Sequence, residues 1–143
     1  MANFIYVTGG LKTERKVTED TIAFCLKKLL PRVRSLEIEV KLKNIKGDAI
    51  GYCLMEDNTR TFTLEIQKGQ KLKDLITTVT HEMVHVKQYY RKEMNDSLTT
   101  SGNAKWKGKR VAPDTTYYDL PWEKEAYRMQ DTLANEIWEK GLV

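Results

Sequence analysis

The chain has few of the residues that stabilise small secreted or fibrous proteins: among 143 residues there are two cysteines, three prolines and eight glycines. Cys25 and Cys53 are too few for a disulfide framework and lack the C-x-x-C spacing, so we expect reduced thiols in a cytoplasmic protein. No apolar run approaches the roughly 18 residues that cross a bilayer. The stretch from Met1 to Gly10 also lacks the charge and apolar length of a secretory signal. We therefore expect no contact with a membrane.

What the sequence does contain is enough material for one folded domain. Hydrophobic residues make up 41% of the chain and charged residues 31%, which excludes an intrinsically disordered chain. No repeat, low-complexity tract or linker divides it, so we expect residues 1–143 to form a single domain and a monomer. The formal net charge of +4 permits contact with nucleic acid without establishing it.

Hydrophobic periodicity predicts an α+β fold. Thr18 is expected to cap a helix that ends at Pro31. Alternating apolar and polar residues then predict about three strands in a mainly antiparallel sheet, with a turn over Glu56–Thr59. The expected strands are Leu36–Lys43, Ala49–Met55 and Arg60–Ile66.

In the second half of the chain the pattern changes to a period of 3.6 residues. It predicts one helix from Leu72 to about Lys92 and another from Pro121 to about Lys140. The polar stretch between them, 94–118, is long for a connection inside a compact domain, so we expect a basic loop over or near a functional cleft.

The chain has two histidines, and both belong to an H-E-x-x-H motif, His81-Glu82-Met83-Val84-His85. Because residues four apart share one face of a helix, both imidazoles can bind a single metal ion. The adjacent Glu82 can reach a water on that ion without binding the ion itself. We therefore predict a site for one Zn²⁺ ion, with His81 and His85 as ligands and Glu82 as the catalytic base.

Such a site needs a third protein ligand, and no histidine remains to provide it. On a helical wheel of the last helix, Glu123 falls inside the apolar half, where a carboxylate is costly unless it is paired or bound to metal. Glu125 falls on the polar half, where it can pair with Arg128 as a solvated charge. Glu123 is the favoured ligand, Glu125 remains the alternative, and Cys53 is disfavoured.

These residues resemble the zincin metallopeptidases, specifically single-domain gluzincins (minigluzincin-like proteins) and SprT-like proteins. The resemblance rests on the segments His81–Tyr89 and Pro121–Tyr127 and on the strands before them. In gluzincins the ligand glutamate commonly precedes an alanine by three residues, as Glu123 precedes Ala126. The chain lacks the third histidine and the zinc ribbon of many SprT-like proteins. It also has Tyr127 where gluzincins often carry an acid.

The resemblance implies a zinc-dependent endopeptidase in which Glu82 takes a proton from water and returns it to the leaving amine. Tyr117 or Tyr118 would be the candidate contact for the oxyanion or the substrate. A peptide or protein substrate would lie extended along an edge strand, either Ala49–Met55 or Thr61–Ile66.

The 94–118 segment raises an alternative function. Lys105, Lys107, Lys109 and Arg110 surround Trp106, a composition that can contact a phosphate backbone or an unpaired base. SprT-like relatives act on proteins bound to DNA, which makes DNA association worth testing, although a solvated loop is the favoured interpretation. The competing hypotheses are a zinc-braced, nucleic-acid-associated binding module without proteolysis and a metal-free interaction protein with a vestigial motif.

Overall fold

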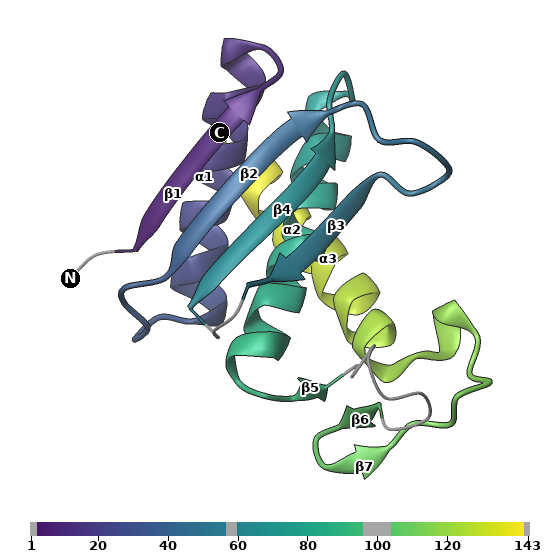
Figure 1. Ribbon diagram of the computed structural model, residues 1–143. Coiled ribbons are helices and arrows are strands. Elements are labelled where there is room, and N and C mark those ends of the chain that lie inside the picture. The colour runs from purple at the N-terminus through teal and green to yellow at the C-terminus, as the bar shows by residue number, and fades with distance from the viewer. Residues whose placement is uncertain (1–2, 57–59, 96–103, 142–143) are drawn as a thin grey trace.

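The computed structural model describes residues 3–56, 60–95 and 104–141. It is an α+β arrangement in which three long helices lie behind a four-stranded sheet (Figure 1). The helices are α1 (Lys12–Leu29), α2 (Leu72–Tyr90) and α3 (Pro121–Glu139). The main sheet contains β1 (Phe4–Gly9), β2 (Glu37–Lys43), β3 (Gly51–Met55) and β4 (Thr61–Gln67), in the spatial order β1-β2-β4-β3.

The observed sheet differs from the predicted one because it contains an additional strand, β1, and is mostly parallel. It pairs in parallel with β2, and β2 pairs in parallel with β4, so only the β3–β4 pairing is antiparallel. The prediction of about three mainly antiparallel strands was wrong for two reasons: β1 was not recognised, and β3 lies at the edge of the sheet instead of between β2 and β4. The run Phe4-Ile5-Tyr6-Val7-Thr8 before two glycines is typical of a strand, and a strand–helix–strand order favours parallel pairing.

Helix α1 begins six residues before the predicted cap. Its first turn is stabilised by Glu14, whose Oε1 accepts a hydrogen bond of 2.7 Å from the backbone N–H of Leu11. The other oxygen of Glu14 accepts one from the N–H of Gly69, also at 2.7 Å. Thr18 is buried inside the helix and does not cap it. Capping of the helix by Glu14, which accepts a hydrogen bond from Leu11 three residues earlier, was not predicted from the sequence.

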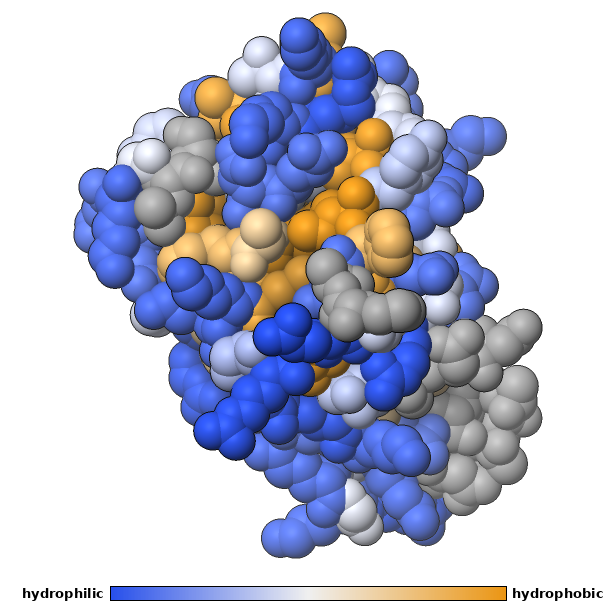
Figure 2. Space-filling model, turned by 90° about the vertical axis from the view of Figure 1, so that its left-hand side faces the viewer, coloured by the Kyte–Doolittle hydropathy of each residue, from blue (hydrophilic) through white to orange (hydrophobic). Residues whose placement is uncertain are grey.

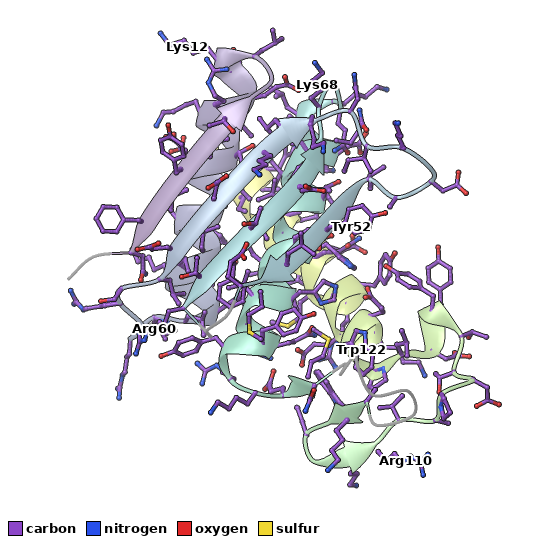
Figure 3. All side chains as sticks on the ribbon, viewed as in Figure 1. Lys12, Tyr52, Arg60, Lys68, Arg110 and Trp122 are labelled. Carbon is purple, nitrogen blue, oxygen red and sulfur yellow. The ribbon has the colours of Figure 1, made fainter. Side chains whose placement is uncertain are left out.

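The predicted hairpin in the sheet is confirmed by the antiparallel pairing of β3 and β4. Residues 57–59 of the predicted turn lie outside the described residues. Alternation along β2 buries Ile38, Val40 and Leu42 against the helices and leaves their neighbours exposed. On the same exposed face of the sheet, β3 carries Tyr52 (Figure 3). The helices therefore cover one face of the sheet.

Helices α2 and α3 lie within two residues of their predicted bounds, and their apolar faces pack in one core with the sheet and α1. Leu75, Ile76, Val79 and Met83 of α2 are fully buried. Among the described residues, no helix is long and apolar enough to cross a membrane.

The segment between α2 and α3 contains more structure than a loop. Short strands β5 (Met94–Asn95), β6 (Lys105–Trp106) and β7 (Lys109–Arg110) form a second, antiparallel sheet, and a short 3-10 helix, η1 (Tyr117–Asp119), precedes α3. Residues 96–103 of the predicted loop lie outside the described residues. This small sheet projects below the main one in Figure 1.

The side of the molecule that carries β1 shows hydrophobic residues between hydrophilic ones (Figure 2). A pocket of about 320 Å³ lies there between β1 and α1, and its lining includes Ile5, Leu26 and Leu30. Its lining residues include no histidine, cysteine or acid, the side chains that most often bind metal.

Candidate metal centre

Helix α2 places both histidines on the side that faces α3. His81 and His85 are each 7% exposed, and their rings meet edge to face with centroids 4.9 Å apart. This follows from the helix, because one turn brings residues four apart onto the same face. The predicted use of the two histidines as a pair is therefore consistent with the geometry of α2.

Glu123, from the first turn of α3, lies between the two imidazoles. Its Oε1 is 3.0 Å from Nε2 of His81 and its Oε2 is 3.2 Å from Nε2 of His85. Burial opposes ionisation of this carboxyl, but the contacts with His81 and His85 outweigh it and lower the pKa of Glu123 to about 2. The structure thus brings Glu123, and not Glu125, to the histidines.

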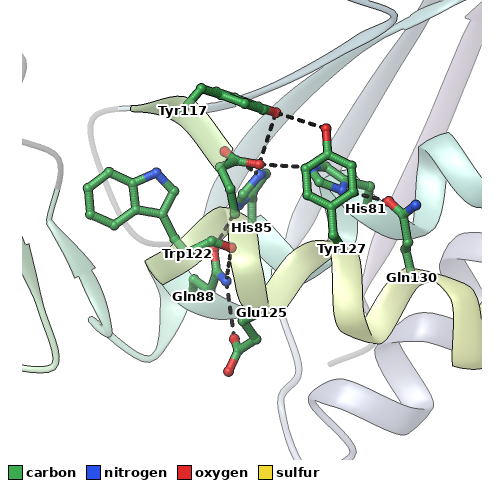
Figure 4. Close-up of polar contacts among 9 residues, drawn as sticks. His81, His85, Gln88, Tyr117, Trp122, Glu125, Tyr127 and Gln130 are labelled. Atoms are coloured by element: carbon green, nitrogen blue, oxygen red, sulfur yellow. Dashed lines mark hydrogen bonds and ion pairs between the residues drawn. The ribbon is translucent and has the colours of Figure 1, made fainter. Parts of the chain in front are cut away.

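The protonation pattern around the histidines fits a bound cation. Nδ1 of His81 faces the amide oxygen of Gln130, and Nδ1 of His85 faces that of Gln88, each at 2.7 Å (Figure 4). Because an amide oxygen only accepts, each Nδ1 carries a proton. Nε2 can then carry a second proton and donate it to Glu123, the contact that, against the effect of burial, raises the pKa of His85 and lowers that of Glu123, or it can present its lone pair to a metal ion. In either state a positive charge lies between the nitrogen and the carboxylate.

The spacing of the ligand atoms also fits a metal ion. Ligand atoms at about 2.0–2.1 Å from a tetrahedral ion lie roughly 3.3 Å apart. Glu123 has one oxygen near that distance from each ring, Oε1 at 3.0 Å from His81 and Oε2 at 3.2 Å from His85, and both are also hydrogen-bond distances. His81, His85 and Glu123 form a buried group that could hold a metal ion, with ligand atoms within 4.8 Å of one another. In the part of the chain that the structure describes, no fourth His, Cys, Asp or Glu joins them, and Cys53 stays outside the group.

Glu82 lies in the cleft beside this group. The cleft has a volume of about 590 Å³, and β3, α2, η1 and α3 all contribute to its lining. Burial raises the pKa of Glu82, whereas His85 and His81 favour its charged form. A methyl group added at Gly51 of β3 would lie 3.0 Å from Oε2 of Glu82. The glycine therefore leaves room for this carboxylate under the edge of the sheet.

Of the two tyrosines predicted near the site, Tyr117 reaches the candidate ligand Glu123. Its hydroxyl donates a hydrogen bond of 3.0 Å to Oε1 of Glu123 and lies 3.4 Å from the hydroxyl of Tyr127. Burial, the contact with Tyr127 and the nearby Glu123 all raise the pKa of Tyr117. Tyr118 is 71% exposed and lines the cleft, with its ring packed edge to face against that of Tyr117.

Glu125 corrects one prediction. It does pair with Arg128, whose Nη2 is 3.9 Å from Oε2 of Glu125, but with a side-chain exposure of 10% it is not a solvated charge. Its Oε1 accepts hydrogen bonds of 2.8 Å from Lys87 and 3.1 Å from Gln88, and these lower the pKa of Glu125 although burial opposes them. The helical wheel failed here because α2 covers this side of α3.

Sequence reasoning missed the two glutamines that contact the histidines. Gln88 follows His85 by three residues, a spacing that places both on one side of α2 and that could have indicated it. Gln130 lies 49 residues after His81 in the sequence and meets it only because α3 packs against α2. No signal in the sequence pointed to that contact.

The four cations of the 94–118 segment lie away from this centre. Lys105, Lys107, Lys109 and Arg110 are exposed on β6, β7 and the turn between them, and none of them lines the cleft. Figure 3 shows Arg110 at the edge of the small sheet. The amine of Lys107 lies 5.2 Å from the centre of the Trp106 ring. The predicted nucleic-acid residues therefore do not line the cleft, although Lys107 is near enough to Glu125 to favour its charged form.

Comparisons with models of protein families, with curated proteins and with solved structures found no match for this chain.

Proposed function

We propose that this protein is a zinc-dependent endopeptidase of the gluzincin type. The observation that carries the proposal is the convergence of His81, His85 and Glu123 in a cleft that also contains the carboxylate of Glu82. Two nitrogens, one carboxylate oxygen and an open fourth position are the ligand set of catalytic zinc in peptidases. A zinc ion held there would supply a Lewis acid for the peptide carbonyl and lower the pKa of a bound water.

In this proposal Glu82 moves the proton. Water adds to the carbonyl carbon of the peptide bond as Glu82 accepts the water's proton, and the C–N bond then breaks as Glu82 returns that proton to the leaving amine. The raised pKa of Glu82 suits both halves of the transfer, since a base is most effective when its pKa is near the working pH. In this proposal the Tyr117 hydroxyl, which donates to Glu123 in the structure, donates instead to the developing oxyanion.

The substrate in this proposal lies along β3. Of the two candidate edge strands, β4 is central and β3 is at the edge of the main sheet, where Gly51, Tyr52 and Cys53 line the cleft. The carbonyl of Ile50 and the N–H of Glu56 bond to β4. In an antiparallel ladder, alternate residues of a strand face opposite neighbours. The odd-numbered residues between Ile50 and Glu56, among them Gly51, therefore direct their backbone N–H and C=O groups away from β4. An extended peptide can pair with that side and present its carbonyl to the proposed metal centre beside Glu82.

The Glu82→Gln variant tests the mechanism. It keeps the size of the side chain and removes the proton acceptor, so hydrolysis of a casein or peptide-library substrate should fall by about 10²–10⁴-fold or more. Zinc measured by elemental analysis should stay at one ion per chain, because Glu82 is not a ligand. If Glu82→Gln hydrolyses peptides at the wild-type rate, the mechanism is refuted. If the wild-type protein itself contains no metal, the zinc-dependent functions are refuted and the hypothesis of a vestigial motif is supported.

A second function is favoured by one observation, the exposure of Lys105, Lys107, Lys109 and Arg110 on a single small sheet. In this alternative the protein is a nucleic-acid-associated module whose zinc braces α2 and α3 without proteolysis. It requires DNA or RNA binding that weakens steeply with salt. It also requires a closed metal site, whereas the described residues supply three ligands.

A further inference from the structure

Gln88 is a fully buried amide whose orientation is fixed by its neighbours. Its Nε2 donates to the carbonyl of Trp122 at 2.9 Å and to Oε1 of Glu125 at 3.1 Å. Both partners can only accept, so the NH₂ group must face them and the amide oxygen must face the opposite way. That direction is toward His85, whose Nδ1 is 2.7 Å from Oε1 of Gln88. The amide therefore fixes a proton on Nδ1.

Gln130 makes the same contact with the other histidine. Its Oε1 is 2.7 Å from Nδ1 of His81, and its Nε2 is directed to Oδ1 of Asp131 at 3.4 Å. Gln88 belongs to α2 and Gln130 to α3, so each helix contributes one amide to the same pattern (Figure 4). In both cases the histidine nitrogen that remains, Nε2, points at Glu123.

We propose that Gln88 and Gln130 are positioning residues that hold His85 and His81 in the tautomer whose Nε2, on the side of Glu123, is free to bind metal. The inference rests on the proposed metal centre and adds how its ligands are oriented. Both supports are uncharged amides, so they add no negative charge to a cleft that already contains the carboxylates of Glu82 and Glu123. Gluzincins often use an acid at the position of Tyr127 to orient a histidine. Here the amides of Gln88 and Gln130 take that role.

The support of His85 extends further into the structure. Oε1 of Glu125 binds both Gln88 and Lys87, and the amine of Lys87 also lies 2.9 Å from Oε1 of Glu93. These groups are mostly buried, with side-chain exposures of 10%, 13% and 18% for Glu125, Lys87 and Glu93. The chain of contacts runs from His85 to the residue before β5. Gln88 is therefore held by an ion-pair network, whereas Gln130 is held by one long contact.

The experiment measures metal binding rather than proteolysis, so its failure differs from failure of the proposed function. Zn²⁺ affinity is measured by competition with a chromophoric chelator for the tag-free wild type and for Gln130→Leu, Gln88→Leu and Gln130→Glu. Removing the acceptor in either leucine variant should weaken binding by about 10- to 100-fold. Gln130→Glu keeps the acceptor and adds charge, so it should bind Zn²⁺ at least as tightly as the wild type. Asn135→Leu, at an exposed amide on α3, is the matched control and should not change the affinity.

A spectroscopic measurement separates positioning from loss of structure. In the Co²⁺-loaded protein each ring should give one exchangeable, strongly shifted N–H proton signal, and the chain has two histidines to assign. Gln130→Leu should speed the exchange of one signal, because its Nδ1–H loses its partner. Gln130 is half-buried, so this variant remains informative if Gln88→Leu does not fold. Unchanged affinity and exchange in Gln130→Leu would overturn the proposal, as would weaker binding in Gln130→Glu.

Discussion

The cleft between β3, α2 and α3 and the small sheet of β5, β6 and β7 both carry charged side chains, but they hold them differently. In the cleft, His81, His85 and Glu123 are buried, and each makes polar contacts. His81 contacts Gln130, and His85 contacts Gln88 and Glu123. On the small sheet, Lys105, Lys107 and Lys109 are exposed.

The contrast shows which chemistry the fold supports more strongly. Ionisable side chains are rarely buried unless they are paired or bind a metal, so a buried group of this kind indicates a specific role. Exposed lysines are common on any basic protein and indicate little by themselves. The cleft therefore provides the better argument for function, and the following variants test that ranking.

The largest effect is expected from a matched pair on α3. Glu123→Gln should weaken Zn²⁺ binding by more than about 100-fold. That exceeds the loss of affinity, at most about 100-fold, that is typical when a residue that only orients a ligand is removed. Glu125→Gln, two residues later, should weaken it by about tenfold or less, since Glu125 touches Gln88 and Lys87. Competition titration measures both. Equal losses in the two variants would mean that Glu123 is not a ligand.

A smaller effect is expected at the edge of the cleft. In Gly51→Ala the new methyl group would lie 3.0 Å from Oε2 of Glu82 and 3.1 Å from Cγ2 of Thr78, so Glu82 must shift. Peptide hydrolysis should fall by about 10- to 100-fold, because small misplacement of a reacting group is costly. Zn²⁺ affinity should not change. Added to Glu82→Gln, the substitution should cause no further loss of hydrolysis; an additional loss would point to a separate role for Gly51.

The smallest effect on the cleft is expected from the small sheet. Replacing Lys105, Lys107, Lys109 and Arg110 with glutamine should change Zn²⁺ affinity and peptide hydrolysis by less than about twofold. Exposed substitutions of this kind usually alter stability by less than about 0.5 kcal/mol each. Fluorescence anisotropy with a short DNA duplex and a single strand, measured over a range of salt, tests the alternative. Suppose that the wild type binds DNA in a salt-dependent way, that this variant does not, and that neither hydrolyses peptides. The small sheet would then be a better argument for function than the cleft.

Much of this site was predictable because it is local in the sequence. His81, Glu82 and His85 follow from one turn of a helix, and the helix follows from apolar residues at its period. The wheel also singled out Glu123, because a carboxylate in an apolar face needs a partner. Their positions in the structure agree with these predictions.

Other parts depended on contacts between distant segments. The wheel of α3 placed Glu125 in solvent because it contained no information about α2, whose Lys87 and Gln88 cover it. The run of apolar and β-branched residues in β1 could have predicted a strand, but its parallel pairing with β2 depends on the path of α1. Gln130 and Tyr117 reach the site through packing of α3 and η1, which no spacing reveals.

The sequence by itself determined that both histidines and Glu82 share a helix, because helical periodicity acts over a few residues. It also limited the third ligand to an acid or a cysteine, since no third histidine exists, and it favoured Glu123. Only the tertiary structure decided which acid meets the histidines, which amides orient them, and that β3 rather than β4 borders the cleft. Those choices depend on how α3 and the sheet pack against α2, and packing is set by the whole core rather than by any one segment.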